Sequence, residues 1–172
     1  MNERTLRRAV NQGTLRAARP TPRALELPLP ERRYVRRSWS LLSALRTALR
    51  TEPNVRFALL FGSAATGTDT SSTSDVDIVV GLRDPSLERV VDLSAKLTAV
   101  IGRHVDVVRL GDAEAEPLFL ADLVTEGRVL VDREELWPRL RRREAGLRRR
   151  GRKQEAQRAR AALAGIDRLL NV

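Results

Sequence analysis

The feature that most constrains the fold is a fixed order of apolar runs and small polar motifs in the middle of the chain. An almost continuous apolar run, Val55–Phe61, leads directly into Gly62-Ser63. After eleven intervening residues, Asp75-Val76-Asp77 opens a second apolar run, and Asp106 lies inside a third. Short apolar runs bounded by polar segments are typical of buried strands. The order predicts a small sheet with polar motifs where its strands begin or end.

Helical spacing surrounds these strands. Leucines recur three and four residues apart after Ser38, which we expect to cap a helix that ends before Pro53. Further helices are expected over 84–101, with Asp84 as cap and Gly102 as stop, and over 116–126. The third strand is expected over 104–110 and a fourth at Arg128–Asp132. The pattern predicts an α+β fold, sandwich-like, with a small mixed sheet and flanking helices.

Charge divides the chain into three parts. Residues 1–50 carry 12 basic and 3 acidic side chains, 51–135 carry 8 and 16, and 136–172 carry 12 and 3. We expect a basic N-terminal arm over 1–37, a core over 38–132 and Arg-rich helices, broken near 146–151, over 133–172. The arm reads as a short helix followed by two extended runs, either a β-hairpin or a winged-helix remnant. Both basic segments are candidates for nucleic-acid contact.

Composition excludes several kinds of site. The chain has no Cys and one His, so it offers no disulfide, no thiolate zinc site and no Cys nucleophile. Any metal must bind oxygen ligands. No apolar run approaches the roughly 20 residues that span a bilayer, and the N-terminus lacks the apolar stretch of a signal peptide. We therefore expect a cytoplasmic protein with no membrane partner.

The acidic motifs suggest a magnesium site beside a phosphate-binding turn. Residues i and i+2 of a strand face the same side, so Asp75 and Asp77 would present two carboxylates together. Their repulsion is relieved by a hard cation such as Mg²⁺, and Asp106 on a neighbouring strand would complete a two-metal site. Gly62 allows close approach of a phosphate, and the backbone and hydroxyl of Ser63 can donate to it.

Residues 55–132 resemble the minimal nucleotidyltransferases of the DNA polymerase β-like superfamily. The stretch from Phe61 to Gly67 is similar to the family's Gly-Ser turn, that from Ser74 to Ile78 to its metal-binding pair, and that from His104 to Val108 to its third carboxylate strand. The resemblance implies the nucleotidyltransferase fold. It also implies that Asp75, Asp77 and Asp106 are catalytic and bind Mg²⁺, and that Gly62 and Ser63 hold the nucleotide triphosphate.

Small bacterial members of this family often act as antitoxins that transfer AMP from ATP to a tyrosine of a helical HEPN toxin. The leading hypothesis is therefore a Mg²⁺-dependent protein adenylyltransferase, with ATP as substrate and a HEPN toxin as partner. Nucleotidylation of an antibiotic and template-free tailing of RNA are rival reactions, although both normally need a larger body.

Two departures from the family pattern leave another alternative. The interval before Asp75 is one residue longer than the family's common spacing, and Thr66 stands where an Arg is frequent. A weak or inactive transferase fold that regulates a partner, or binds nucleic acid through its arms, is the alternative. The small core is compatible with a homo-oligomer or a partner complex.

Overall fold

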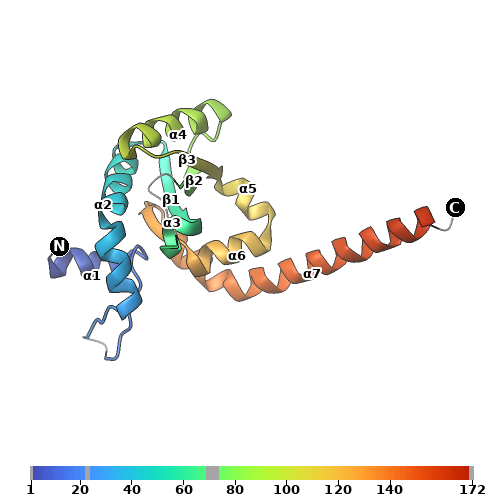
Figure 1. Ribbon diagram of the computed structural model, residues 1–172, viewed down its shortest axis with the longest axis horizontal. Coiled ribbons are helices and arrows are strands. Elements are labelled where there is room, and N and C mark those ends of the chain that lie inside the picture. The colour runs from blue at the N-terminus through green and yellow to red at the C-terminus, as the bar shows by residue number, and fades with distance from the viewer. Residues whose placement is uncertain (1, 22–23, 69–73, 171–172) are drawn as a thin grey trace.

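The computed structural model describes residues 2–21, 24–68 and 74–170, with side chains omitted for 165 and 167–170. The chain runs through eleven helices and strands within these residues (Figure 1). In order they are α1 (Glu3–Asn11), α2 (Leu29–Thr51), β1 (Val55–Phe61), α3 (Gly62–Thr66), β2 (Val76–Leu82), α4 (Leu87–Ile101), β3 (Val105–Arg109), α5 (Leu110–Ala115), α6 (Pro117–Glu126), β4 (Arg128–Asp132) and α7 (Leu136–Leu170).

The four strands form one mixed sheet in the order β3-β2-β1-β4. Strand β1 is antiparallel to both of its neighbours, and β2 is parallel to β3. A parallel pair needs a crossover, which α4 provides. The expected mixed sheet with flanking helices is confirmed.

Helices cover both faces of the sheet, giving three layers. On one face α2 and α4 pack on β1 and β2, and the buried residues there include Leu42, Leu45, Leu49, Leu60, Ile78 and Leu97. On the other face α5, α6 and α7 bury Phe57, Leu59, Val79, Leu120, Trp137, Leu140 and Leu147. Strands β1 and β2 are buried from both sides, which explains why they read as continuous apolar runs rather than alternating ones.

The N-terminal segment packs against the core. Ala9 and Leu15 are buried, and the backbone N–H of Val129 in β4 donates to the carbonyl of Gly13 at 3.1 Å. The Thr14 hydroxyl donates to the carbonyl of Val129 at 2.6 Å. An antiparallel bridge joins Ala18 to Glu26, and residue 23, where the second expected extended run begins, lies outside the described residues.

Several expected element boundaries are wrong. Helix α2 begins at Leu29 rather than at Ser38, because Pro30 is compatible with the first turn and the added residues turn Glu31, Tyr34 and Val35 inward. Helix α2 therefore continues across residue 37, the expected boundary between the N-terminal arm and the core. The division of the chain into arm, core and C-terminal segment stays a prediction. Helix α4 begins at Leu87, since Asp84 accepts from the Ser86 N–H and forms a turn there.

The C-terminal segment is one helix, not two. The helix continues through Gly151. A Cβ at this position would overlap Leu118 of α6, so the glycine allows α6 and α7 to pack closely. Helix α5 was not expected, since its six residues are too few for a helical pattern. Beyond Gly151, α7 extends away from the sheet (Figure 1).

Candidate active site

Two neighbouring strands bring the three aspartates to one end of the sheet. Asp75 immediately precedes β2, Asp77 is the second residue of β2, and Asp106 is the second residue of β3. In the parallel register Asp77 is paired with Asp106, and the N–H of Val76 donates to the carbonyl of His104 at 2.9 Å. Sequence reasoning could only assume that these strands were neighbours, and the register supports that assumption.

The carboxylates repel one another. Burial raises the pKa of Asp77, and the nearby charges of Asp106 and Asp75 raise it further. Asp75 and Asp106 are exposed, while Asp77 is half-buried. A bound cation would oppose this shift, because it favours the charged form of the carboxyl group. The three groups therefore influence one another electrostatically across the strand ends.

The Gly-Ser turn lies directly against Asp77. Phe61, the last residue of β1, is paired with Asp77 in the antiparallel register. The next residue, Gly62, has φ +69°, and a Cβ built on it would overlap Oδ2 of Asp77. Only glycine satisfies both the left-handed backbone and the close approach. The turn and the aspartate motif, predicted as two halves of one site, are in contact.

Short helix α3 continues from this turn. Ser63 is half-buried, and its carbonyl accepts from the N–H groups of Gly67 at 2.8 Å and Thr68 at 3.0 Å. The Thr66 hydroxyl donates to the carbonyl of Gly62 at 3.2 Å, so it tightens the turn from within. Residues 69–73 of the polar stretch before Asp75 lie outside the described residues.

A buried arginine that was not predicted from the sequence contacts the backbone of α3. Arg128 of β4 donates from Nε to the carbonyl of Ala65 at 2.6 Å. It pairs with Glu31 of α2 at 2.6 Å, and its guanidinium lies 3.5 Å from the ring centroid of Tyr34. The Tyr34 hydroxyl donates to the carbonyl of Ala64 at 3.0 Å, and Arg37 donates to the carbonyl of Gly67.

We call Arg128, Glu31 and Tyr34 the Arg128 clamp, because Arg128 and Tyr34 donate to backbone carbonyls of α3 and so hold the Gly-Ser turn in position. Arg128 and Glu31 are nearly inaccessible, with side-chain exposures of 2% and 6%. Such a pair is stable in the interior only because its hydrogen bonds are satisfied. One signal was available in the sequence, namely a single Arg opening an otherwise apolar strand.

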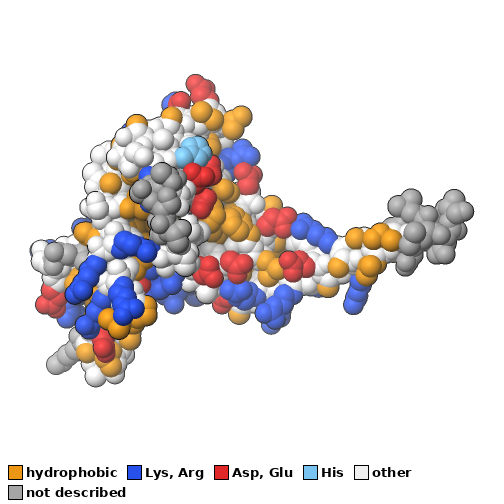
Figure 2. Space-filling view, in the orientation of Figure 1, with side chains coloured by type: hydrophobic (Ala, Val, Ile, Leu, Met, Phe, Trp, Pro, Cys, Tyr) orange, Lys and Arg blue, Asp and Glu red, His pale blue; other side chains and the backbone are white. Residues whose placement is uncertain are grey.

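The side chain of Asp106 turns toward His104. Nε2 of His104 lies 3.0 Å from Oδ1 of Asp106, and both side chains are exposed. In Figure 2 the histidine surface borders acidic side chains. Among the residues that the structure describes, no three Asp, Glu or His side chains are arranged to hold a metal ion. The three aspartates thus lie at the same end of the sheet, but their carboxylates do not converge on one point.

The donor chemistry nevertheless fits a hard cation. All three candidate ligands are carboxylates, the oxygen donors that Mg²⁺ prefers. The raised pKa of Asp77 arises partly from uncompensated neighbouring negative charge, which a bound cation would offset. The residues present therefore suit magnesium by charge and by donor type.

Known proteins share this fold. One solved structure, a toxin–antitoxin with AMP-PNP, is 24% identical with a TM-score of 0.56, and the match covers 73% of this chain and 97% of that chain. An MntA–HepT toxin–antitoxin structure is 21% identical with a TM-score of 0.53, covering 74% and 97%. A tri-AMPylated Shewanella oneidensis HEPN toxin with an MNT antitoxin is 20% identical with a TM-score of 0.50, covering 77% and 98%. At these identities the likeness concerns the fold alone.

Sequence comparison decides the family. No curated protein matches the chain. None of the helices in residues 2–21, 24–68 and 74–170 combines the length and apolar content needed to span a bilayer. Residues 44–136 match the family model described as polymerase beta, nucleotidyltransferase. Because that match spans more than half of the 172 residues and contains the Gly-Ser turn and all three aspartates, the chain belongs to the polymerase beta nucleotidyltransferase family.

Proposed function

We propose that this chain transfers AMP from ATP to a tyrosine hydroxyl of a HEPN toxin, and so acts as the antitoxin of a toxin–antitoxin pair. The observation that carries the proposal is the contact between Gly62 and the Asp77 carboxylate. It unites a phosphate-binding turn and a cation-binding motif in a single site. Two solved structures with the same fold, a toxin–antitoxin with AMP-PNP and a tri-AMPylated HEPN toxin with an MNT antitoxin, support the choice of nucleotide and acceptor.

Each candidate residue has a role in this proposal. The backbone of Gly62 and the hydroxyl of Ser63 hold the triphosphate. Asp75, Asp77 and Asp106 would hold magnesium, which, when bound, neutralises charge on the phosphates and on departing pyrophosphate. Asp106 is exposed beside the half-buried Asp77, so it is reachable by an acceptor hydroxyl.

The reaction is a displacement at the α-phosphorus. The tyrosine oxygen forms a bond to that phosphorus, and the bond from phosphorus to the bridging oxygen breaks, releasing pyrophosphate. Asp106 accepts the hydroxyl proton. The Arg128 clamp keeps α3 and the Gly-Ser turn in position, which limits reorganisation of the site during the reaction.

Intact-mass spectrometry of the co-expressed partner tests the proposal. Co-expression with wild type is expected to add the mass of AMP to the HEPN protein, and Asp75→Asn/Asp77→Asn is expected to abolish the addition. Glu88→Gln/Asp92→Asn is the matched control, because it removes two exposed carboxylates on α4 that have no ion-pair partner among the described residues. An unmodified partner with wild type, or equal loss in the control, would contradict the proposal.

A further inference from the structure

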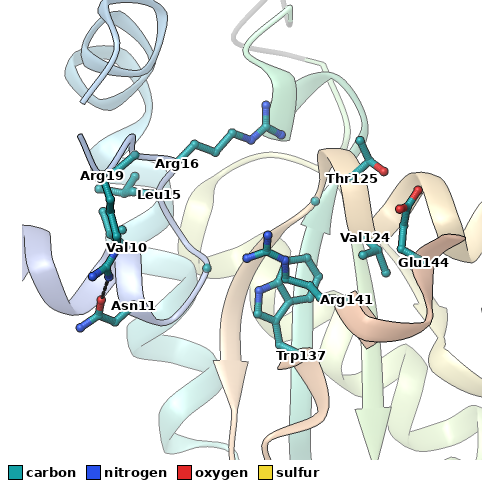
Figure 3. Close-up of a pocket in the computed structure, with 13 residues that line it drawn as sticks. Val10, Asn11, Leu15, Arg16, Arg19, Val124, Thr125, Trp137, Arg141 and Glu144 are labelled. Carbon is teal, nitrogen blue, oxygen red and sulfur yellow. Dashed lines mark hydrogen bonds between the residues drawn. The ribbon is translucent and has the colours of Figure 1, made fainter. Parts of the chain in front are cut away.

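A cavity on the other side of the Arg128 clamp joins the two basic ends of the chain. Its volume is about 700 Å³, within the range of ligand-binding pockets. We call it the arginine pocket, after Arg16 and Arg19 from the N-terminal segment and Arg141 from α7. Figure 3 shows Trp137 and Arg141 of α7 facing Val10, Leu15 and Arg16 across the cavity. None of the five candidate active-site residues lines it.

Two of its three arginines make their side-chain hydrogen bonds to neutral groups. Arg16 donates to the carbonyl of Glu126, and Arg19 donates to the Asn11 amide oxygen at 2.6 Å, so both of these partners are neutral. Arg141 has no hydrogen bond or ion pair with any described residue. The acidic residue of the lining, Glu144, is already paired with Arg148. Three guanidinium groups around one cavity create a field that attracts anions.

The surroundings of Arg16 disfavour its charge. Partial burial lowers the pKa of Arg16 most, and the positive charge of Arg128 lowers it further, while the carboxylates of Glu31 and Glu126 act in the opposite direction. An anion in the cavity would offset the first two effects. Planar guanidinium groups bind phosphate oxygens through paired hydrogen bonds, so phosphate is the anion that three arginines fit best.

The floor of the pocket offers an aromatic edge. Trp137 is 8% exposed, and its indole packs so closely on Gly13 that a Cβ there would overlap Nε1. The indole N–H has no hydrogen-bond partner among the residues that the structure describes. Val10, Leu15 and Val124 supply apolar wall. An apolar floor with an available donor suits an unpaired base beside its phosphate.

We propose that the arginine pocket binds the phosphates and one unpaired base of a single-stranded nucleic acid. A recessed site of this size accepts one nucleotide of a strand, and exposed Arg142 and Arg143 on α7 extend the basic surface beyond it. The two charged segments seen in the sequence thus form one site by folding together. This site is separate from the candidate active site and does not depend on the proposed transferase activity.

Fluorescence anisotropy with a labelled single-stranded RNA of about 12 nucleotides tests the assignment. Arg16→Gln/Arg141→Gln removes two arginines of the pocket that are both accessible to solvent, and a thermal melt verifies that the variant folds. Arg83→Gln/Arg89→Gln is the matched control, because it removes the same charge at the opposite end of the sheet, where Arg83 follows β2. The Asp75→Asn/Asp77→Asn protein separates this site from the transferase site.

The expected result is binding by wild type that the pocket variant weakens roughly 10-fold or more and the control leaves nearly unchanged. Loss of two phosphate contacts should also reduce the slope of log affinity against log salt by about 1.4. Binding should persist in the Asp75→Asn/Asp77→Asn protein.

Four outcomes would overturn the proposal. The first is no RNA binding by wild type, and the second is equal weakening in pocket and control variants. The third is competition by AMP at an affinity similar to that of RNA, which would assign the pocket to a free nucleotide. The fourth is equally tight, pocket-dependent binding of a polyglutamate peptide, which would assign it to an acidic protein.

Discussion

Replacing Arg128 by Met should destabilise the protein more than any exposed arginine substitution. The guanidinium is 2% exposed and makes two bonds to Glu31, at 2.6 and 3.0 Å, and one to the Ala65 carbonyl at 2.6 Å. It also donates to the carbonyl of Thr14 at 3.2 Å. One side chain therefore connects α2, α3, β4 and the N-terminal segment.

The magnitude follows from what the substitution leaves behind. Without Arg128, the carboxylate of Glu31 stays buried, and among the described residues its remaining donor is the backbone N–H of Arg16 at 3.0 Å. Breaking a buried pair in this way costs about 3–5 kcal/mol. For a chain of this size, that corresponds to a fall in melting temperature of roughly 6–20 °C. The pair of Arg158 with Glu116 is exposed and screened by water, so Arg158→Met should change stability little and is the control.

Urea unfolding followed by circular dichroism measures these free energies. The double substitution Glu31→Leu/Arg128→Met should lose less than the sum of the single losses, because neither charge is then left buried alone. It should remain below wild type, since the carbonyls of Ala65 and Thr14 still lose a donor. A loss below 1 kcal/mol for Arg128→Met, or full additivity, would refute the reasoning.

Three further perturbations follow from the site and from α7. Gly62→Ala should lower the unfolding free energy by about 1–3 kcal/mol. The loss should exceed that of Gly102→Ala, because both glycines have positive φ but only Gly62 lies against a side chain. Equal losses in urea titrations would contradict the contact with Asp77. In the folded state, burial raises the pKa of Asp77 above 3.8, and the negative charges of Asp106 and Asp75 raise it further. The contribution of Asp77 to stability therefore falls as the pH rises from 3.8 through this raised pKa. Asp77→Asn should therefore be more stable than wild type at pH 7, with the difference shrinking toward pH 3.8; an unchanged difference across a urea series in pH would contradict this. Ending the chain after Gln154 should change the melting temperature by only a few degrees, because the described side chains beyond it are exposed, and a large fall in a thermal melt would show that this part of α7 supports the fold.

The sheet and its motifs were predictable because they depend on local pattern. Each apolar run became a strand, Gly102 ends α4 with φ +67°, and Arg128–Asp132 is the fourth strand. Apolar runs reveal burial, and a positive φ after a helix favours glycine. These signals are contained within a few residues.

The missed features depend on contacts between distant residues. Nothing near Arg128 in the sequence indicates that its partner is Glu31, 97 residues away. Gly151 resembles a helix stop until its packing on Leu118 is known. Likewise, the two basic ends carried no sign that Arg16 and Arg141 would line one cavity. Burial of polar groups is decided by the assembled layers rather than by local propensity.

Calorimetric titration of ATP with Mg²⁺ tests the central claim most directly. Wild type and Glu88→Gln/Asp92→Asn are expected to bind ATP only when Mg²⁺ is present, and Asp75→Asn/Asp77→Asn is expected to lose that binding. Magnesium-dependent binding that survives in Asp75→Asn/Asp77→Asn, or no binding by wild type, would contradict the assignment of the Gly62–Asp77 region as the nucleotide site.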